Sequence, residues 1–325
     1  IQRSYTEIKR FMQCPRLEHF VRFNPGGTVS RCGHMVDPPK FTSLEEMEHS
    51  DWMYRIHMNE DWPAECIRCR DTESVNGKSI RQNAIEFDKQ QTKHDYLTVG
   101  GILDNVCNSA CFSCDASYST KIGSLTNKIY PVVDNSNAYW NLPLERVVHL
   151  DINGGEPSAS KNYKRILQNL PPNLKSLRLN TNCSLVIEEL EDIVASGVDV
   201  TVTASLDGIG DVHDYVRWPI KWDKFYSNLM IYRTMNVKLN TWTTLSALNI
   251  RDFKNIIKFV KQNKLDHSYA FLENPTVLNV KYRNKFTSAC AGLFDLVATD
   301  RNNDFELEYF LNQQNEARGI NEAFR

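Results

Sequence analysis

The feature that most constrains the fold is an alternation of β-prone and helical segments that begins near residue 95. Apolar runs with strand character are separated by stretches whose apolar residues recur every three or four positions, the spacing of an amphipathic helix. About six such units favour an α/β fold with a parallel sheet, curved into a partial (β/α)6 TIM-like barrel. The expected strands are 96–103, 146–152, 176–179, 198–204, 238–244 and 269–272. The expected helices are 161–170, 187–195, 222–235 and 250–262.

The chain before residue 90 has a different composition, rich in Cys, Trp, His, Met and Pro. Pro25, Gly26 and Gly27 lie between two short β-prone runs, which predicts a hairpin. A polar stretch over 83–93 is expected to be a linker. The predicted domains are a small Cys-rich domain over 1–90, a barrel over 91–285, and a C-terminal part over 286–325 in which a helix at 286–298 precedes a polar tail.

Composition excludes several classes of protein. The 325 residues carry 38 Lys and Arg against 40 Asp and Glu, so there is no general attraction to nucleic acid or to an anionic membrane. No run approaches the roughly 18 apolar residues of a membrane helix, and the first residues lack the apolar core of a secretory signal. A cytoplasmic protein without a membrane or nucleic-acid partner is expected.

The cysteines are unevenly distributed: nine are present, and seven of them precede residue 115. An odd number in a chain without a signal peptide argues against a disulfide framework. Thiolates that serve as metal ligands in a reducing compartment explain this clustering better.

The densest group is the run CNSACFSC, in which Cys107, Cys111 and Cys114 have C-x3-C-x2-C spacing. Cysteine thiolates are the normal protein ligands of iron–sulfur clusters. Three of them on a four-iron cluster leave one iron open for another ligand. The alternatives are a structural zinc site, which needs four closed ligands, and buried thiols that bind no metal.

Unusual residues follow the first four predicted strands of the barrel. The cysteine run follows the first strand, Gly154, Gly155 and Glu156 follow the second, Asn182 follows the third, and Ser205 ends the fourth. The carboxyl ends of parallel strands meet at one edge, where such folds bind ligands. We therefore expect these residues to share one site.

The cysteine triplet, together with GGEP at 154–157, resembles the radical SAM superfamily. In that family three cysteines hold a 4Fe–4S cluster, and S-adenosylmethionine (SAM) binds its fourth iron. The resemblance implies reductive cleavage of SAM to a 5′-deoxyadenosyl radical that abstracts a substrate hydrogen, with flavodoxin or ferredoxin as the external electron donor. The family usually has an aromatic residue just before the third cysteine, whereas this chain has Ser113 there and Phe112 one position earlier.

The run TVTASLDGIGDVHDYVR resembles the branch that contains sulfatase-maturating enzymes and peptide-modifying radical SAM proteins. A forked Arg donor suits a carboxylate, and a Ser hydroxyl suits a ribose or a carboxylate. His213 and Asp214 open a helix, where Asp is a normal cap, so a structural role is expected for both, and no catalytic acid or base is identified. The resemblance implies SAM contacts from Gly154, Gly155, Glu156, Asn182, Ser205 and Arg217.

The segments around Cys14, Cys32, Cys66 and Cys69 resemble a SPASM/twitch domain, placed here before the barrel rather than after it. The resemblance implies that these four thiolates hold an auxiliary 4Fe–4S cluster, so two clusters are expected in all. A four-thiolate zinc site is the alternative, and His34 is a weaker candidate ligand for either metal group.

Two cysteines, Cys183 and Cys290, have no partner at ligand spacing and are not expected to bind metal. The function predicted from all these features is radical SAM chemistry on a peptide or protein side chain. The alternatives are a sugar or nucleotide substrate and a non-enzymatic zinc-binding interaction module.

Overall fold

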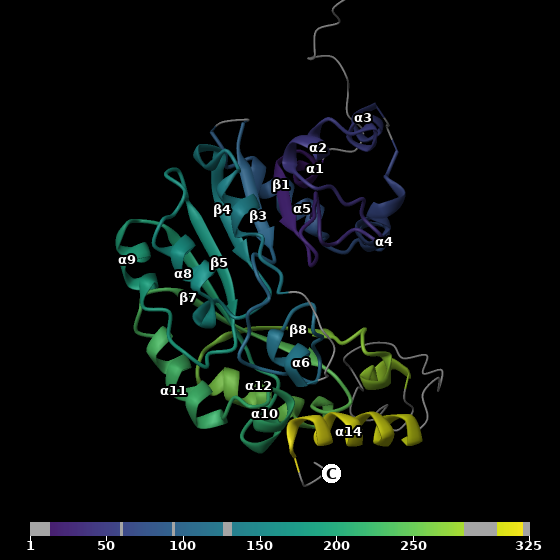
Figure 1. The fold of residues 1–325 in the computed structure, drawn as a ribbon, viewed down its shortest axis with the longest axis vertical. Coiled ribbons are helices and arrows are strands. Elements are labelled where there is room, and N and C mark those ends of the chain that lie inside the picture. The colour runs from purple at the N-terminus through teal and green to yellow at the C-terminus, as the bar shows by residue number, and fades with distance from the viewer. Residues whose placement is uncertain (1–13, 59–60, 93–94, 126–131, 283–303, 321–325) are drawn as a thin grey trace, which may run out of the picture.

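An eight-stranded sheet forms the framework of the protein (Figure 1). The computed structural model describes residues 14–58, 61–92, 95–125, 132–282 and 304–320. Within them the strand order is β2-β1-β3-β4-β5-β6-β7-β8, and every neighbouring pair is parallel except β1 with β2. The strands are β1 (Phe20–Phe23), β2 (Val29–Ser30), β3 (Leu97–Gly101), β4 (Val147–Ile152), β5 (Ser176–Thr181), β6 (Asp199–Ser205), β7 (Lys238–Leu245) and β8 (Asp266–Phe271).

The strands from β3 to β8 follow one another across the sheet in chain order, which confirms the predicted α/β class and partial barrel. Among the described strands, β2 and β8 form open edges.

No described helix has the length and apolar character needed to cross a membrane. The α-helices are α1 (Pro15–His19), α2 (Leu44–Glu48), α3 (Asp51–Met58), α4 (Ile67–Ser74), α5 (Ile80–Asp88), α6 (Thr120–Leu125), α7 (Ser136–Trp140), α8 (Lys161–Leu167), α9 (Glu189–Ala195), α10 (Asp211–Val216), α11 (Trp222–Tyr232), α12 (Phe253–Gln262) and α14 (Asp304–Arg318). Short 3-10 helices cover Ala64–Cys66, Leu144–Arg146, Pro157–Ala159, Ile250–Asp252, Thr276–Leu278 and Val280–Tyr282.

Alternation along the barrel strands separates an apolar face from a polar one. In β6, Val200, Val202 and Ala204 are buried in the main core, whereas Thr201 and Thr203 between them are half-buried. Successive side chains of a strand point to opposite faces of the sheet. The apolar residues therefore pack in the core with the surrounding helices, and the polar residues line the inner face of the barrel.

The N-terminal segment is joined to the barrel through this sheet. The predicted hairpin at 25–27 is present, and its first strand, β1, pairs in parallel with β3, with Phe20 opposite Thr98 and Phe23 opposite Gly101. In Figure 1, helices α1 to α5 gather on the side of β1 that faces away from β4. One sheet thus connects the regions before and after residue 90.

The linker predicted over 83–93 is wrong in its first half, because α5 continues to Asp88. This helix begins with a capping box in which the Ser79 side chain accepts a hydrogen bond from Gln82 N–H and the Gln82 side chain accepts one from Ser79 N–H. Such reciprocal bonds satisfy backbone donors that a helix start leaves without partners.

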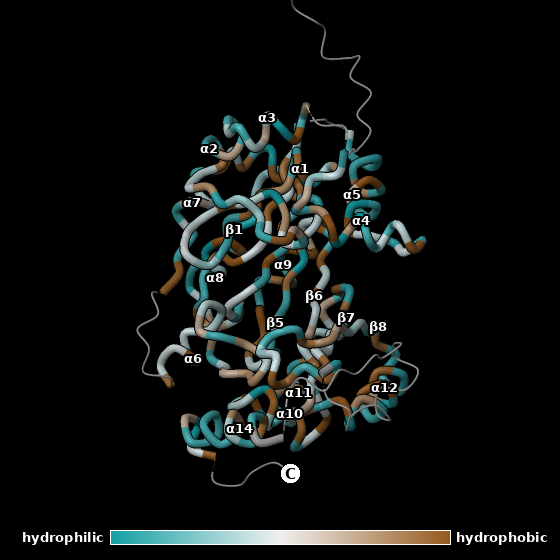
Figure 2. Tube along the Cα trace, turned by 90° about the vertical axis from the view of Figure 1, so that its right-hand side faces the viewer, coloured by the Kyte–Doolittle hydropathy of each residue, from teal (hydrophilic) through white to brown (hydrophobic). Residues whose placement is uncertain are grey.

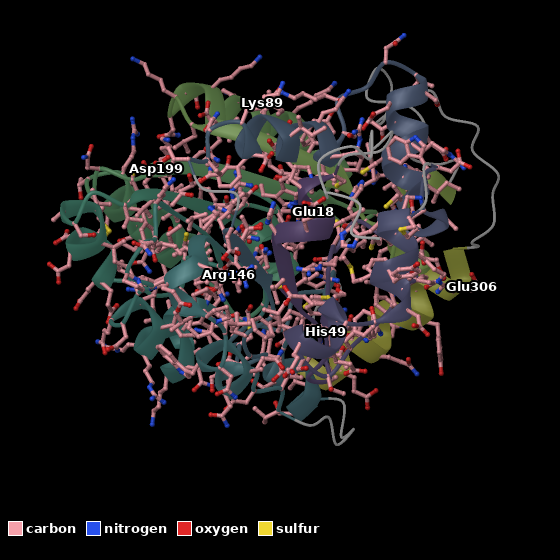
Figure 3. The ribbon with its side chains drawn as sticks, turned by 90° about the horizontal axis from the view of Figure 1, so that it is seen from above. Glu18, His49, Lys89, Arg146, Asp199 and Glu306 are labelled. Atoms are coloured by element: carbon pink, nitrogen blue, oxygen red, sulfur yellow. The ribbon has the colours of Figure 1, made fainter. Side chains whose placement is uncertain are left out.

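Helix α14 occupies residues that were expected to form a polar tail, and it lies beside α10 in Figures 1 and 2. Its buried residues include Asn315 and Arg318 as well as Leu307. Figure 3 shows Glu306 of α14 and Asp199 of β6 on opposite sides of the molecule. The helix predicted at 286–298 lies outside the described residues.

Two glycines with the same backbone angle test the contact between β1 and β3. Gly101 and Gly197 both have a left-handed φ of 92°, but a Cβ at Gly101 would lie 2.2 Å from Phe23 O, whereas one at Gly197 would meet nothing within 4 Å. We expect Gly101→Ala to lower the free energy of unfolding by about 3 kcal/mol or more, and Gly197→Ala to lower it by about 1 kcal/mol from the backbone alone. Urea unfolding followed by circular dichroism measures both, and equal losses would contradict the close contact of the two strands.

Candidate functional site

The loop that carries the cysteine triplet (residues 107–114, the cysteine loop) follows β3 and is held by the backbone after α10. Ala110 N–H donates to Trp218 O at 2.7 Å, and Phe112 N–H donates to Val216 O at 3.0 Å. A segment without regular secondary structure needs such partners for its buried amides. The cysteine loop is therefore fixed from the side of α10.

Ser109 and Asn182 hold the cysteine loop from the opposite direction. The Ser109 hydroxyl lies 3.3 Å from Cys107 Sγ and 3.5 Å from Cys111 Sγ. Asn182, which follows β5, donates from Nδ2 to Ser109 Oγ at 3.2 Å and to Asn108 Oδ1 at 2.9 Å. Asn182, predicted as a SAM contact, thus also supports the loop that carries the thiols.

The three thiols of the cysteine loop influence one another electrostatically. Removal from water raises the pKa of the Cys107 and Cys114 thiols, and the charge of Cys111 raises both further. All three cysteines line one cavity. A metal group binds thiolates and displaces their protons, so it relieves the burial cost that keeps these thiols protonated.

Gly154 and Gly155 press against the chain that leads from β3 into the cysteine loop. Their φ values are 84° and 60°. A Cβ at Gly154 would lie 2.7 Å from Ile102 Cγ1, and a Cβ at Gly155 would lie 2.8 Å from both Asp104 O and Val106 O. Both glycines are predicted SAM contacts, and the close packing of the two loops is a separate reason for glycine at each position.

The Glu156 carboxylate joins the loops after β4 and β5, and its backbone joins the loop after β3. Oε1 accepts hydrogen bonds from the Ser158 hydroxyl at 2.7 Å and the Thr181 hydroxyl at 2.8 Å, and Oε2 accepts from Asn182 N–H at 2.6 Å. Glu156 N–H donates to Val106 O at 2.8 Å. Burial raises the pKa of Glu156, and these donors oppose that rise. Both carboxylate oxygens of Glu156 are therefore engaged by the protein's own groups.

Arg217 places a largely buried positive charge in the cavity that the three cysteines line. Its Nη1 donates to Asp207 Oδ2 at 2.7 Å, and Asp207 Oδ1 accepts from Thr244 N–H at 2.8 Å. Burial alone lowers the pKa of Arg217, but the charges of Cys111 and Asp207 outweigh it and raise the pKa. Its Nε is buried and has no hydrogen-bond partner among the described residues. A ligand carboxylate is an acceptor suited to such a donor.

These side chains line one cavity of about 500 Å³ at the carboxyl ends of the strands. Small-ligand sites commonly have volumes of roughly 300–1,000 Å³. Every residue predicted to bind SAM or the SAM-associated cluster lines this cavity: Cys107, Cys111, Cys114, Gly154, Gly155, Glu156, Asn182, Ser205 and Arg217. The arrangement can thus hold a metal group and a polar organic ligand side by side.

The aromatic rings of this cavity do not come from the cysteine loop. Phe112 is buried and stacks on Tyr215, with ring centroids 4.6 Å apart. Ser113 lines the cavity, and the aromatic side chains there are those of Tyr118 and Trp242. The shift of the aromatic residue by one position in the sequence therefore places Phe112 behind the loop.

The four N-terminal cysteines surround a second, small cavity of about 20 Å³. Burial raises the pKa of Cys14 to about 11 and that of Cys66 to about 12, and neighbouring thiols, including that of Cys32, add to both shifts. Burial also raises the pKa of Cys69. These raised pKa values favour the protonated form of the Cys14, Cys66 and Cys69 thiols, whose protons a metal group displaces when it binds.

Cationic and polar groups surround the four thiols. His34 N–H donates to Cys32 Sγ at 3.4 Å, and Arg16 and Arg81 line the same cavity. Arg81 Nη2 is held 2.6 Å from Glu73 Oε2. Hydrogen bonds and positive charge near sulfur stabilise an anionic iron–sulfur cluster.

Within the described ranges, no three His, Cys, Asp or Glu side chains are arranged to hold a single metal ion. A four-iron cluster binds each cysteine through a different iron atom. Its ligands therefore need not converge on one point, as the ligands of a zinc ion must.

Other residues singled out in the sequence lie away from these cavities. Cys183 is fully buried in the main core and has a left-handed φ of 54°. Cys290 lies outside the described residues. Asp214 caps the next helix rather than its own, because its Oδ1 accepts from Trp222 N–H at 2.5 Å. The His213 ring is buried against Phe225, with centroids 4.4 Å apart.

Sequence reasoning missed two supporting residues. Asp207 belongs to the SLDG run, but the sequence alone does not show that it pairs with Arg217, because that pairing depends on the turn into α10. Tyr163 resembles an ordinary core residue of α8, yet its hydroxyl accepts from Leu103 N–H and donates to Gly154 O, both at 3.0 Å. It thereby ties together the chain that follows β3 and the glycine loop.

Comparison with known proteins finds partial likenesses among solved structures. No protein-family model matches the chain, and no curated protein matches it significantly. A structure of anSMEcpe with bound AdoMet is 18% identical, covers 55% of this chain and 52% of its own, and has a TM-score of 0.41. SuiB of Streptococcus suis bound to S-adenosylmethionine is 16% identical, covers 74% of this chain and 55% of its own, and has a TM-score of 0.44. The chain thus spans about half the length of these proteins.

The buried ring of His213 makes stability depend on pH. Burial, together with the charge of Arg217, lowers the pKa of His213 to about 3, below the roughly 6.5 of an unfolded chain. The unfolded chain therefore binds more protons below pH 6.5, so the stabilisation is complete above that pH and is lost as the pH falls towards 3. At pH 5 the loss is about 2 kcal/mol.

We expect His213→Leu to remove this part of the pH dependence. Urea unfolding at pH 7 and pH 5 measures it, and the difference between parent and variant cancels the contribution of the carboxylates. A parent and a variant that lose the same stability between the two pH values would contradict the buried neutral ring.

Proposed function

We propose that this protein is a radical SAM enzyme. The observation that carries the proposal is the shared cavity, in which three thiols of one short loop lie with Gly154, Gly155, Asn182, Ser205 and Arg217. These residues come from loops far apart in the sequence. If they served only to pack the core, they would not need to line the same cavity. Their donor types suit a metal cluster next to a charged organic ligand.

Cys107, Cys111 and Cys114 would hold a 4Fe–4S cluster, which would supply the electron for reductive cleavage of a SAM molecule bound in the same cavity. The chain's own share is positioning and exclusion of water. Ser109 and Asn182 orient the thiols, and Arg217 offers Nε to the carboxylate of SAM. Ser205 offers a hydroxyl, and Tyr118 and Trp242 offer flat faces for a heteroaromatic base.

For the N-terminal region, 1–90, we propose an auxiliary 4Fe–4S site held by Cys14, Cys32, Cys66 and Cys69. The support is their common cavity with Arg16, Arg81 and His34. An ion pair links this region to the chain beside the proposed SAM cavity. Arg68, which lies between Cys66 and Cys69 in the sequence, is 3.7 Å from Glu273. Asn274, which follows Glu273, lines that cavity. An auxiliary cluster here is suited to accept an electron from a substrate radical at the mouth.

As the substrate we propose a peptide or protein side chain. This follows from the resemblance of the SLDG run to peptide-modifying radical SAM proteins. The reductant is an external one-electron donor such as flavodoxin or ferredoxin. A non-enzymatic zinc-binding module is the rival function, and metal analysis of anaerobically purified protein separates the two: iron with sulfide supports the proposal, and stoichiometric zinc without iron contradicts it.

Single substitutions in the cysteine loop test the assignment of the first cluster. We expect Cys107→Ala, Cys111→Ala and Cys114→Ala each to abolish formation of 5′-deoxyadenosine after dithionite reduction, because each removes one of only three protein ligands. Chromatography of the nucleoside measures this loss. Cys183→Ala is the matched control and should keep both iron and SAM cleavage. A triplet variant that cleaves SAM at the parent rate would refute the assignment.

A double substitution separates the two proposed clusters. We expect Cys66→Ala with Cys69→Ala to lower iron content by about half, because one of two four-iron clusters is lost, while SAM cleavage continues without product from the substrate. Iron analysis and nucleoside chromatography measure the two effects, after size exclusion has verified folded protein. If a folded, half-iron variant no longer cleaves SAM, the N-terminal cysteines belong to the catalytic site instead.

A further inference from the structure

The last described helix, α14, reaches the cysteine loop from behind. Arg318 donates from Nε and Nη2 to the same acceptor, Ala110 O, at 3.1 and 2.8 Å. Ala110 lies between two of the triplet cysteines, and its N–H is bonded to Trp218 O at 2.7 Å. Both backbone polar groups of Ala110, its N–H and its C=O, are therefore hydrogen-bonded.

A stack of side chains extends this contact. The Arg318 guanidinium carbon lies 4.3 Å from the ring centroid of Phe112, whose other neighbour is the ring of Tyr215 at 4.6 Å. The Tyr215 hydroxyl donates to Asn315 Oδ1 at 2.9 Å. Asn315 and Arg318 are three positions apart, on one face of α14. This face of α14 contacts Tyr215 through Asn315 and Phe112 of the cysteine loop through Arg318.

The charge of Arg318 has no carboxylate partner within the described part of the chain. Its side chain is buried, with only 7% of the residue exposed, and Nη1 bonds to the neutral groups Gln314 O and Gln314 Oε1 at 2.9 and 2.6 Å. The ionisable groups that influence it are the Cys111 thiol and the Tyr215 hydroxyl. A buried cation without a counter-ion is costly. The thiol of Cys111, the residue that follows Ala110, becomes an anion when it binds a metal cluster.

We propose that α14 is part of the cluster site and that Arg318 is a positioning residue, which holds the cysteine loop and balances the negative charge of its bound cluster. The proposal rests on the radical SAM function proposed above. It assigns to a helix near the end of the described chain a role in the loop that follows β3.

Amide hydrogen exchange of the metal-free protein tests the positioning role without any cluster. We expect Arg318→Gln to raise exchange of the peptide that covers 107–114 by about tenfold, because the charge-assisted bonds to Ala110 O are lost. The matched control is Arg233→Gln, which removes an exposed arginine at the end of α11 and should leave this peptide unchanged. Unchanged exchange in a folded Arg318→Gln variant overturns the positioning role.

The reduction potential of the triplet cluster tests the charge. Reduction adds negative charge, so loss of a nearby buried cation should make the midpoint potential more negative in Arg318→Gln. Arg318→Lys keeps the positive charge but loses the paired N–H donors of the guanidinium. Its midpoint potential should therefore be closer to that of the parent than its rate of amide exchange is. Redox titration followed by electron paramagnetic resonance, in protein whose Cys66 and Cys69 are replaced by Ala, reports this cluster alone.

The outcomes separate this proposal from the proposed function. A parent protein that binds no cluster at the triplet overturns the radical SAM function and the charge-balancing role together, while the exchange experiment still decides whether Arg318 positions the loop. A cluster that forms normally and keeps the parent potential in Arg318→Gln overturns the charge-balancing role alone.

Discussion

The candidate site depends on the buried carboxylate of Glu156. Side-chain and backbone donors from two loops meet on its two oxygens, and its N–H holds a third loop at Val106 O. Hydrogen bonds from these donors offset the cost of burying the carboxylate. The carboxylate in turn supplies the acceptors that the buried donors need. The loops after β3, β4 and β5 therefore take one mutual arrangement, and the geometry at the cavity follows from it.

The sheet supplies what this network needs. Alternation in β5 and β6 sends apolar side chains to the helix-covered face and leaves the inner face polar, so Asn180 and Ser205 reach the cavity from neighbouring strands. Glycines complete the arrangement, because at Gly155 a side chain would strike the carbonyl oxygens of Asp104 and Val106. Core packing and site geometry are thus set by the same strands.

Much of this could be predicted from the sequence. Strands β3 to β7 could be placed within a few residues because apolar residues recur along each of them, whereas β8 (DHSYAF) is mostly polar and begins three residues before its predicted start. The grouping of Cys107, Gly154, Asn182 and Ser205 follows from the rule that parallel strands end at one edge. Helix α5 was missed although Ser79 and Gln82 form a capping box, because polar composition was read as a linker.

Other features could not be read from the sequence because they depend on contacts between distant segments. The buried face of α14 combines the apolar residues Leu307, Phe310 and Leu311 with the polar residues Asn315 and Arg318, so apolar periodicity covers only its first half. The engagement of Glu156 by Thr181 and Asn182 requires the finished sheet. The ligand set of each cysteine group and the domain boundaries at residues 90 and 285 stay predictions.

The pairing of β1 with β3 has a consequence for the order in which the protein is assembled. Phe20 finds its parallel partner only at Thr98, and until that strand is synthesised β1 has only β2, of two residues, beside it. An isolated hairpin of this size is marginal in water, and closing so long a loop costs chain entropy. The segment that contains β1 is synthesised before β3 and therefore lacks its parallel partner strand until the later segment has been made.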